Sequence, residues 1–193
     1  MKYIFIRHGK THFNEIGLKQ GWCDSPLTKE GIQQIEKMAQ LLKNEKITRA
    51  FTSPTLRAKQ TAQIILKEHD VLLYEDERFK EVNFGILEGL PCSFVDSLHL
   101  ESPNWLEDLE MDYTGYQGEN VKDVIIRHQE ALKEIEKESH EEDCIVVVGH
   151  GCSLYALIKT LLKDEKLAFP ENASAYILYK ENKEYKLDKY LRP

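Results

Sequence analysis

The feature that most restricts the fold is a short apolar run, CIVVVGH, at residues 144–150. Its residues do not alternate between apolar and polar, as they would in a strand with one face in water. A near-continuous apolar run of this length is typical of a strand buried on both faces of a parallel sheet. Such a sheet needs helices on both sides, so the rest of the chain should supply them.

Helix-like and strand-like segments do alternate along the chain. Apolar residues recur at helical spacing at Ile35, Met38 and Leu42, for example, and Thr28 directly precedes that run as a candidate N-cap. Strands are predicted over 2–6, 47–52, 71–75 and 144–150, helices over 29–43, 55–68, 120–138 and 152–163, and two final strands joined at Glu181–Asn182–Lys183. The alternation predicts an α/β fold, a three-layer α/β/α sandwich on a mostly parallel sheet with an antiparallel edge strand.

Length and composition limit the class of protein. The 193 residues should form a single domain, and a formal net charge of −7 without a Lys/Arg-dense run argues against nucleic-acid binding. No apolar run approaches the roughly 18 residues of a membrane span, and no signal peptide is visible. The four cysteines form no C-x-x-C pair, which is typical of reduced thiols in the cytoplasm. We therefore expect a cytoplasmic monomer or homodimer with no nucleic-acid or membrane partner.

Three predicted strands end in similar polar residues. The first ends in Arg7-His8-Gly9, the second precedes a helix that carries Arg57, and the buried strand ends in Gly149-His150-Gly151. Ligands of open parallel sheets bind beyond the carboxyl ends of the strands, where these segments should meet. Two imidazoles and two guanidiniums beside helix N-termini favour an anion, and the planar guanidiniums suit phosphate oxygens.

Five motifs carry a resemblance to a known family. They are RHGKTHFN, DSPLTKEG, SPTLRAKQTA, FKEVNFGILEG and VVGHG, and they span residues 7–151 in that order. Together they resemble the histidine phosphatase superfamily, the phosphoglycerate mutase-like proteins, and among them the phosphatase branch.

The resemblance implies a role for each matching residue. His8 matches the nucleophile that forms a phosphohistidine, and Glu81 matches the general acid/base, with Glu88 as the alternative. Arg7, Arg57 and His150 match the phosphate pocket, Asn14 a further phosphoryl contact, and Gly21 the substrate pocket. The resemblance implies a small phosphorylated substrate and neither a cofactor nor a metal.

The chemistry of these residues is consistent with those roles. An imidazole attacks phosphorus only through an unprotonated nitrogen, so a carbonyl in the Gly9 turn should hold the other nitrogen's proton. Arg7, Arg57 and a cationic His150 would balance the charge of the transferring group, so no metal is needed. His8 and His12 lie four residues apart, but a strand-to-loop break separates them, which argues against a shared metal.

Two positions depart from the family pattern. Lys10 stands where Glu or Gln is more common, and QGEN at 117–120 replaces the usual GGES. Asn120 therefore lacks the serine hydroxyl, and any substrate contact of that hydroxyl is in doubt.

A substrate-covering insert is predicted over residues 85–118. From Glu81 to Val121 the chain has nine acidic residues and no Lys or Arg. If the acids face the pocket, they would repel anionic substrates; the alternative is that they face water. We expect a phosphatase for a monoester with a neutral, aromatic or weakly charged leaving group. A phosphoglycerate mutase would have to recruit basic residues from elsewhere, such as Lys10 or Lys19, and a non-catalytic phospho-ligand-binding protein is the third possibility.

Overall fold

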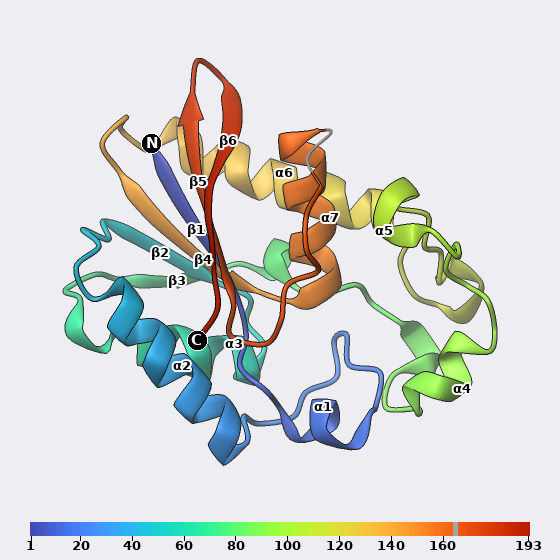
Figure 1. Ribbon diagram of the computed structural model, residues 1–193. Coiled ribbons are helices and arrows are strands. Elements are labelled where there is room, and N and C mark those ends of the chain that lie inside the picture. Colours follow the sequence, from blue (N-terminus) through green and yellow to red (C-terminus); the bar gives the residue numbers. More distant parts are fainter. Residues whose placement is uncertain (164–165) are drawn as a thin grey trace.

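The computed structural model describes residues 1–163 and 166–193. Six strands form one sheet in the order β3-β2-β4-β1-β5-β6. The strands are β1 (Lys2–Arg7), β2 (Arg49–Thr52), β3 (Leu73–Glu75), β4 (Cys144–Gly149), β5 (Ala175–Glu181) and β6 (Glu184–Leu191). The first four strands are parallel to one another, whereas β5 is antiparallel to both β1 and β6 (Figure 1). The predicted mostly parallel sheet with antiparallel pairing at one edge is confirmed.

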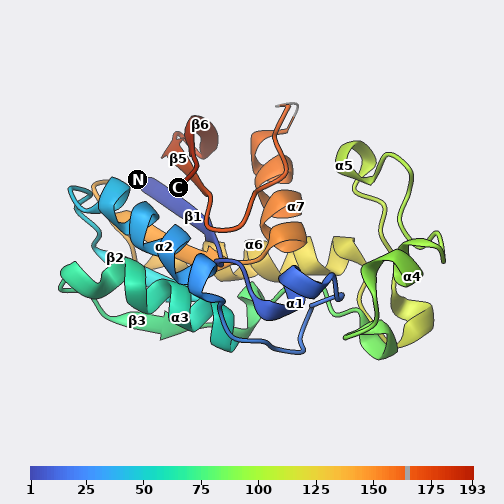
Figure 2. The same ribbon diagram turned by 60° about the horizontal axis from the view of Figure 1, so that its bottom comes forward.

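Helices cover both faces of the sheet, as the apolar run at 144–148 requires. Helices α2 (Lys29–Leu42) and α3 (Leu56–Ile65) pack on Ile4, Val146 and their same-face neighbours. On the opposite face, α6 (Val121–Lys137) and α7 (Gly151–Leu162) contribute to a core around Phe5 and Val147 (Figure 2). Burying each of these large apolar side chains contributes about 1.5–3 kcal/mol relative to leaving it exposed.

Strand register determines where the functional residues meet. Arg7 of β1 is the partner of Gly149 in β4, and Thr52 of β2 is the partner of Val148. Parallel strands in this register end side by side, so His8 and His150 follow their strands at the same edge of the sheet.

Most predicted segments are present, with shorter ends. Thr28 caps α2 by accepting from the Gly31 N–H at 2.9 Å, as predicted. The helix predicted over 55–68 changes at Leu66 into a 3₁₀ turn, η1 (Leu66–Glu68), and the predicted strand 71–75 shortens to β3. This edge strand pairs only with β2, over three residues. The final hairpin turns at Asn182 and Lys183, both at positive φ, as a two-residue turn of the primed type requires.

The segment between the sheet and α6 forms a separate layer of short elements. They are η2 (Glu77–Phe79), η3 (Gly85–Leu87), α4 (Cys92–Asp96), α5 (Trp105–Asp108) and η4 (Thr114–Tyr116). Val82, Val95, Met111 and Tyr113 give this layer its own small core, which includes Ala156 of α7. In Figure 2 the segment that carries α4 and α5 lies beside the sheet, on the side of α6 and α7. The sequence predicted an insert here but none of its short helices, since they lack a sustained apolar period.

All four cysteines are free thiols. Among residues 1–163 and 166–193, no helix has the length and apolar character needed to cross a membrane.

Candidate active site

His8 follows the last residue of β1 and is held in one tautomer. Its Nδ1 lies 2.8 Å from the Gly9 carbonyl oxygen, which has no proton to offer, so Nδ1 donates. The Nε2 atom is then the nitrogen with a free lone pair. Burial and the guanidiniums of Arg57 and Arg7 hold the pKa of His8 well below 6.5. The imidazole is therefore neutral at pH 7, as a nucleophile must be.

His150 lies beside His8 at the start of α7. The two rings are 5.3 Å apart between centroids, at 62° to each other. The sequence indicated a cationic His150, but burial and Arg57 hold its pKa well below 6.5, so its ring is neutral in this structure. Another cation beside two buried guanidiniums is costly, so a cationic His150 against the transferring phosphoryl group stays a prediction.

The Arg7 side chain is held by a backbone carbonyl and by contact with an aromatic ring. Its guanidinium donates to the Pro170 carbonyl at 2.6 Å and lies 5.5 Å from the centre of the Phe169 ring. A Cβ on Gly151 would come within 3.1 Å of the Arg7 Cζ, so only glycine leaves this much room. The side chain is thus positioned by packing and one carbonyl.

Arg57 of α3 is fully buried and is held by the loop over residues 21–24. It donates to the carbonyls of Gly21 at 2.6 Å and Cys23 at 3.0 Å, and to the carboxylate of Asp24 at 3.0 Å. Burial lowers the pKa of Arg57 and Asp24 raises it. Asp24 also accepts from the Leu56 N–H, so one carboxylate joins this loop to the start of α3.

Several buried nitrogens at this edge of the sheet have no hydrogen-bond partner within the described chain. They are Nε of Arg7, Nε of Arg57, and Nδ1 and Nε2 of His150. Buried polar atoms normally find partners, and such exceptions call for an explanation. We call His8, Arg7, Arg57 and His150 the cradle. Its unused donors and fixed positive charge fit an anion.

Two glutamates compete for the acid/base role, and the structure gives them different surroundings. Glu81 is 5% exposed and accepts from three backbone amides, those of Val82 at 3.0 Å, Cys152 at 2.9 Å and Ser153 at 2.7 Å. The last two belong to the first turn of α7, directly after His150. Glu81 is thereby placed next to the cradle.

Glu88 instead holds the 21–24 loop. Its carboxylate accepts from the amides of Trp22 at 2.7 Å and of Cys23, and from Phe84 at 3.2 Å. A Cβ on Gly21 would lie 2.2 Å from the Val82 carbonyl oxygen and 2.6 Å from Glu88 Oε1, which explains the glycine there. The geometry therefore favours Glu81 over Glu88 as the acid/base.

Asn14 and Gly21 lie at the border of the cradle. Asn14 completes a capping box with Thr11 at the start of α1 (His12–Ile16), and its Oδ1 also accepts from Asn172 at 3.2 Å. Asn172 donates to the His8 carbonyl as well, so Asn14 is connected to the His8 backbone. Gly21 contributes its carbonyl to Arg57.

Comparison with known proteins identifies the family of this chain. Residues 3–191 match the model of the histidine phosphatase superfamily (branch 1). The chain is 31% identical over 172 residues to the probable phosphoglycerate mutase GpmB of Yersinia pestis (strain Pestoides F), covering 84% of this chain and 75% of that protein. The chain belongs to the histidine phosphatase superfamily.

Solved structures of related proteins have the same fold. A mycobacterial glucosyl-3-phosphoglycerate phosphatase, in complex with VO3, is 27% identical with a TM-score of 0.85, covering 97% of this chain and 96% of that chain. A phosphoglycerate mutase from Bacillus anthracis str. Sterne is 26% identical with a TM-score of 0.86, covering 97% of this chain and 91% of that chain. The histidine phosphatase superfamily thus includes phosphatases and mutases that resemble this chain about equally.

Two residues near the candidate site, Asp24 and Gln20, were not identified from the sequence. Asp24 orients Arg57 from 33 residues away in sequence, and nothing in the DSPLTKEG motif indicates that contact. Gln20 accepts from the Thr11 hydroxyl at 2.8 Å, which leaves its buried Nε2 without a partner among the described residues. Only the fold brings these side chains to the site.

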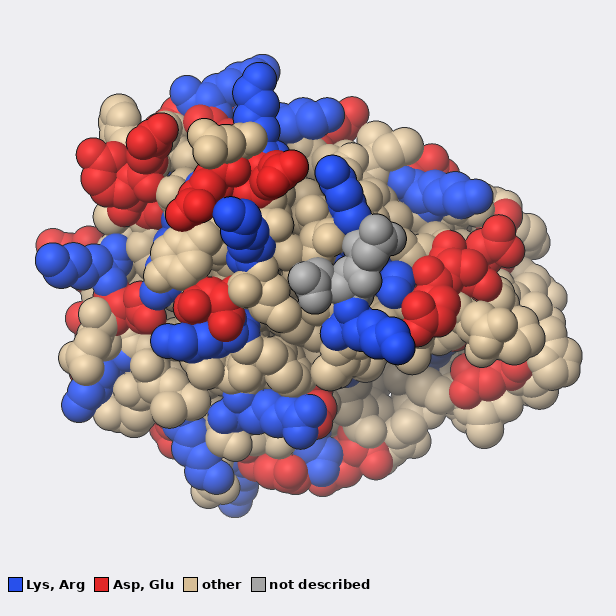
Figure 3. Space-filling model, turned by 45° about the horizontal axis from the view of Figure 1, so that its top comes forward, with Lys and Arg blue, Asp and Glu red and all other residues tan. Residues whose placement is uncertain are grey.

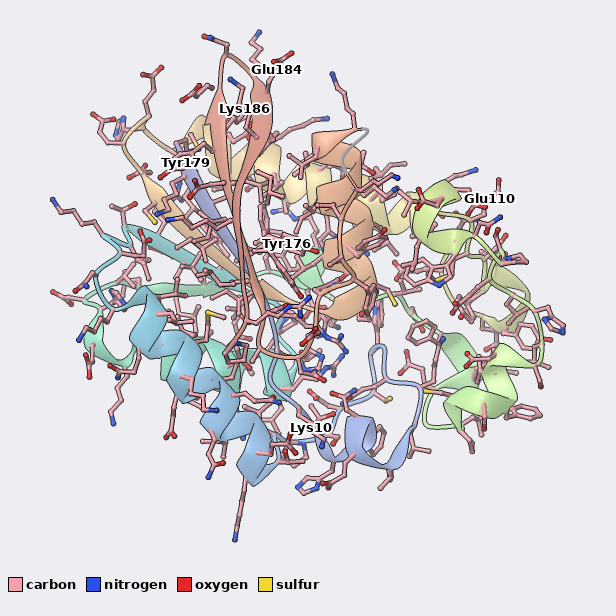
Figure 4. All side chains as sticks on the ribbon, in the orientation of Figure 1. Lys10, Glu110, Tyr176, Tyr179, Glu184 and Lys186 are labelled. Atoms are coloured by element: carbon pink, nitrogen blue, oxygen red, sulfur yellow. The ribbon has the colours of Figure 1, made fainter. Side chains whose placement is uncertain are left out.

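The two departures from the family pattern have local structural roles. Lys10 pairs with Glu30 of α2 at 2.7 Å, and Figure 4 shows it near the start of that helix. Asn120 caps α6 by accepting from the Lys122 N–H at 2.9 Å. Among the residues that the structure describes, neither side chain forms a hydrogen bond to the cradle.

A cavity of about 560 Å³ is lined by Arg7 but by none of His8, Arg57 and His150. Helix α2, residues 169–172 and Arg192 line it. A volume of this size accommodates a small organic group. Its charges are mixed, since Glu171 pairs with Arg192 at 3.2 Å.

No group of three or more metal-ligating side chains occurs in the part of the chain that the structure describes. His12 lies in α1 with 58% of its side chain exposed, beside Glu15 rather than beside His8.

Proposed function

We propose that this histidine phosphatase superfamily member is a phosphomonoester phosphatase that acts through a phosphohistidine on His8. The observation that carries the proposal is the Nδ1 contact to the Gly9 carbonyl, which leaves a neutral Nε2 beside two guanidiniums. Nε2 attacks phosphorus, the N–P bond forms, and the bond between phosphorus and the ester oxygen breaks.

The cradle would stabilise the transferring group by charge and position. Nε of Arg7 and Nε of Arg57 are the buried donors with capacity to spare. Preorganised donors of this kind typically contribute 10²–10³-fold each to the rate. A bound phosphoryl dianion would also favour a proton on His150, because a nearby opposite charge stabilises the cationic ring.

Glu81 would perform both proton transfers. In the first step it gives a proton to the leaving oxygen, and in the second it takes one from the water that attacks phosphohistidine. The second step breaks the N–P bond and releases phosphate. Because Glu81 recovers from water the proton that it gave to the leaving oxygen, one carboxyl group serves both steps.

Two basic side chains that a mutase could recruit are paired with acidic residues. Lys19, one of the two candidates, binds Glu101 at 2.8 Å and lies 4.8 Å from the centre of the Phe84 ring. The other, Lys10, is paired with Glu30. These pairs favour hydrolysis of a monoester with a neutral, aromatic or weakly charged leaving group.

Aromatic side chains near Arg7 support the same preference. Trp105 of the insert, Tyr155 of α7 and Phe169 have ring centroids 5.5–5.7 Å apart. Phe169 is also the ring that contacts Arg7. This cluster offers an apolar surface for a leaving group next to the phosphate site.

The positions of three acidic side chains of the insert bear on the repulsion that the sequence suggested. Glu107 pairs with Lys159 and is 75% exposed, Asp108 accepts from Ser102, and Glu110 lies at the outer side of the insert (Figure 4). The alternative interpretation, in which these acids face water, fits their positions. Substrate preference then depends on the lack of basic side chains to bind an anionic leaving group, rather than on repulsion by the acidic side chains of the insert.

Charge on the outer surface agrees with a small-molecule substrate. In Figure 3, basic and acidic side chains of the described residues are interspersed over the face shown. A nucleic-acid site would require a patch or stripe of one sign. A cytoplasmic location stays a prediction.

A phosphoglycerate mutase is the second candidate, because the relative in Yersinia pestis carries that name. The deciding experiment measures phosphate release, with excess EDTA, from phenyl phosphate, a nucleoside monophosphate, glucosyl-3-phosphoglycerate and 3-phosphoglycerate. We expect EDTA-resistant hydrolysis and an acid-labile, alkali-stable adduct on His8. Formation of 2-phosphoglycerate from 3-phosphoglycerate in the presence of a bisphosphoglycerate primer would support the mutase instead.

A further inference from the structure

We infer that Arg127 and Glu119 are positioning residues that hold Glu81 in place for proton transfer. The inference rests on the proposed function. Arg127 of α6 donates to the Arg78 carbonyl at 2.6 Å, to the Lys80 carbonyl at 2.7 Å and to the Glu81 carbonyl at 2.8 Å. One guanidinium thus fixes the backbone that leads into Glu81.

Glu119, the residue that follows the insert, completes the arrangement. Its two carboxylate oxygens accept from Nε and from a terminal nitrogen of Arg127, both at 3.0 Å. The same carboxylate accepts from the Asn83 amide at 2.9 Å, and the Glu119 amide donates to the Asn83 carbonyl at 2.8 Å. The backbone is therefore held on both sides of Glu81.

The guanidinium of Arg127 is fully used. Its five N–H groups match the five bonds to three carbonyls and two carboxylate oxygens. The side chains of Arg127 and Glu119 are 16% and 21% exposed. A lysine could not reproduce this geometry, since an ammonium has only three donors at one point.

The pair acts on chemistry through the position of one carboxylate. Glu81 has its carboxylate at the first turn of α7, bound two and three residues beyond His150, while its carbonyl is bound by Arg127 and by Trp22 Nε1 at 3.1 Å. Loss of the guanidinium would free the 78–83 backbone and shift the carboxylate. A misplacement of about 1 Å at such a group costs on the order of 10²-fold in rate.

The test uses two substrates that differ in their need for a proton. Phenyl phosphate needs an acid to protonate its leaving phenoxide oxygen. The p-nitrophenolate of p-nitrophenyl phosphate leaves without being protonated. We expect Arg127→Lys to lower kcat/KM at least 30-fold for phenyl phosphate and less than threefold for p-nitrophenyl phosphate. Glu119→Gln, which keeps the side-chain volume, should show the same asymmetry at about tenfold.

A matched control tests for a merely structural role. Arg49 also joins an α6 carbonyl and a glutamate, donating to Ile135 at 3.0 Å and to Glu138 at 3.1 Å, but at the other end of the helix. Arg49→Lys should leave the ratio of the two substrates unchanged. In a Glu81→Gln background, Arg127→Lys should add no further leaving-group dependence, because it acts through Glu81.

Two failures are distinguishable. The first is a folded Arg127→Lys or Glu119→Gln protein that keeps the wild-type ratio of kcat/KM for the two substrates, through equal losses or no loss. That result would overturn the positioning role, and the proposed phosphatase activity would still stand. A wild-type protein that releases phosphate from neither substrate and forms no adduct on His8 would overturn the proposed function and this inference with it.

Discussion

In the cradle at the ends of β1 and β4, buried polar atoms retain hydrogen-bonding capacity, whereas in the neighbouring insert the buried polar groups are satisfied. Nε of Arg7 and both ring nitrogens of His150 have no partner within the described residues. Glu101 of the insert accepts from Lys19 at 2.8 Å and from Tyr113 at 2.5 Å. An unpaired buried polar group costs about 1–3 kcal/mol, so the cradle is a place where a ligand can restore lost interactions.

The difference shows that the two regions are built for different tasks. The cradle is positioned by strand register and close packing, such as Gly151 against Arg7, and its donors remain available. The insert is attached by specific pairs and by a small apolar core around Tyr113. Changes in the cradle should therefore affect the chemical step, and changes in the insert should affect substrate binding.

The largest effect should come from the nucleophile. We expect His8→Ala to lower kcat at least about 10³-fold, because it removes the imidazole whose Nδ1 is bound to the Gly9 carbonyl and whose Nε2 has the free lone pair. Its melting temperature should stay within a few degrees of wild type. His12→Ala, on the exposed side of α1, is the control and should keep full activity. An adduct that persists in His8→Ala would place the nucleophile elsewhere.

The next effect should come from Arg57. Arg57→Lys should lower kcat/KM about 10²-fold, since a point charge cannot bind the 21–24 loop and the phosphoryl oxygens at once. Asp24→Asn should lower kcat/KM by only about tenfold, because it weakens the orientation of Arg57 without removing the guanidinium. Steady-state kinetics on one aryl phosphate compares the two; a larger loss for Asp24→Asn than for Arg57→Lys would contradict this order.

Acid should destabilise the folded protein through three buried histidines. Burial lowers the pKa of His128 to about 3, and of His8 and His150 well below 6.5. Below pH 6.5 the unfolded state binds more protons at these residues than the folded state, so the free energy of unfolding falls with falling pH. Each such histidine contributes up to about 1.4 kcal/mol per pH unit.

Denaturant unfolding between pH 7 and 5 measures that slope. His128→Asn should make it shallower by up to about 1.4 kcal/mol per pH unit. The exposed His99 of the insert provides the control, and His99→Asn should leave the slope unchanged. Equal slopes in wild type and His128→Asn would show that His128 does not carry this dependence.

A smaller effect is expected where the insert is attached. Lys19→Met keeps the apolar stem of the side chain but removes the pair with Glu101, so the insert should lie less firmly over the pocket. We expect KM for an aryl phosphate to rise several-fold with kcat nearly unchanged, measured by steady-state kinetics. A fall in kcat at constant KM would mean that the insert acts on chemistry.

The smallest effect should come from the exposed acids of the insert. Replacing Glu107, Asp108 and Glu110 by Gln, Asn and Gln should change the kcat/KM ratio of phenyl phosphate to 3-phosphoglycerate by less than twofold. Exposed charges of this kind are screened by solvent and salt. A tenfold change would restore the repulsion that the sequence suggested.

The sequence by itself determined the main architecture and the family. A double-faced apolar strand requires a covered parallel sheet, and helical spacing identifies the long helices that cover it. Strand order then explains why Arg7, His8 and His150 meet, since parallel strands share one carboxyl edge. The five motifs are therefore predicted to form one site from the sequence alone.

Only the tertiary structure decided the contacts between segments that are distant in the chain. It distinguished Glu81, at the first turn of α7, from Glu88, which binds the 21–24 loop. It also paired Lys19 with Glu101 and Arg127 with Glu119, and it made His150 neutral. The physical reason is that desolvation and ion pairing depend on what surrounds a charge in three dimensions, which residue spacing along the chain does not record.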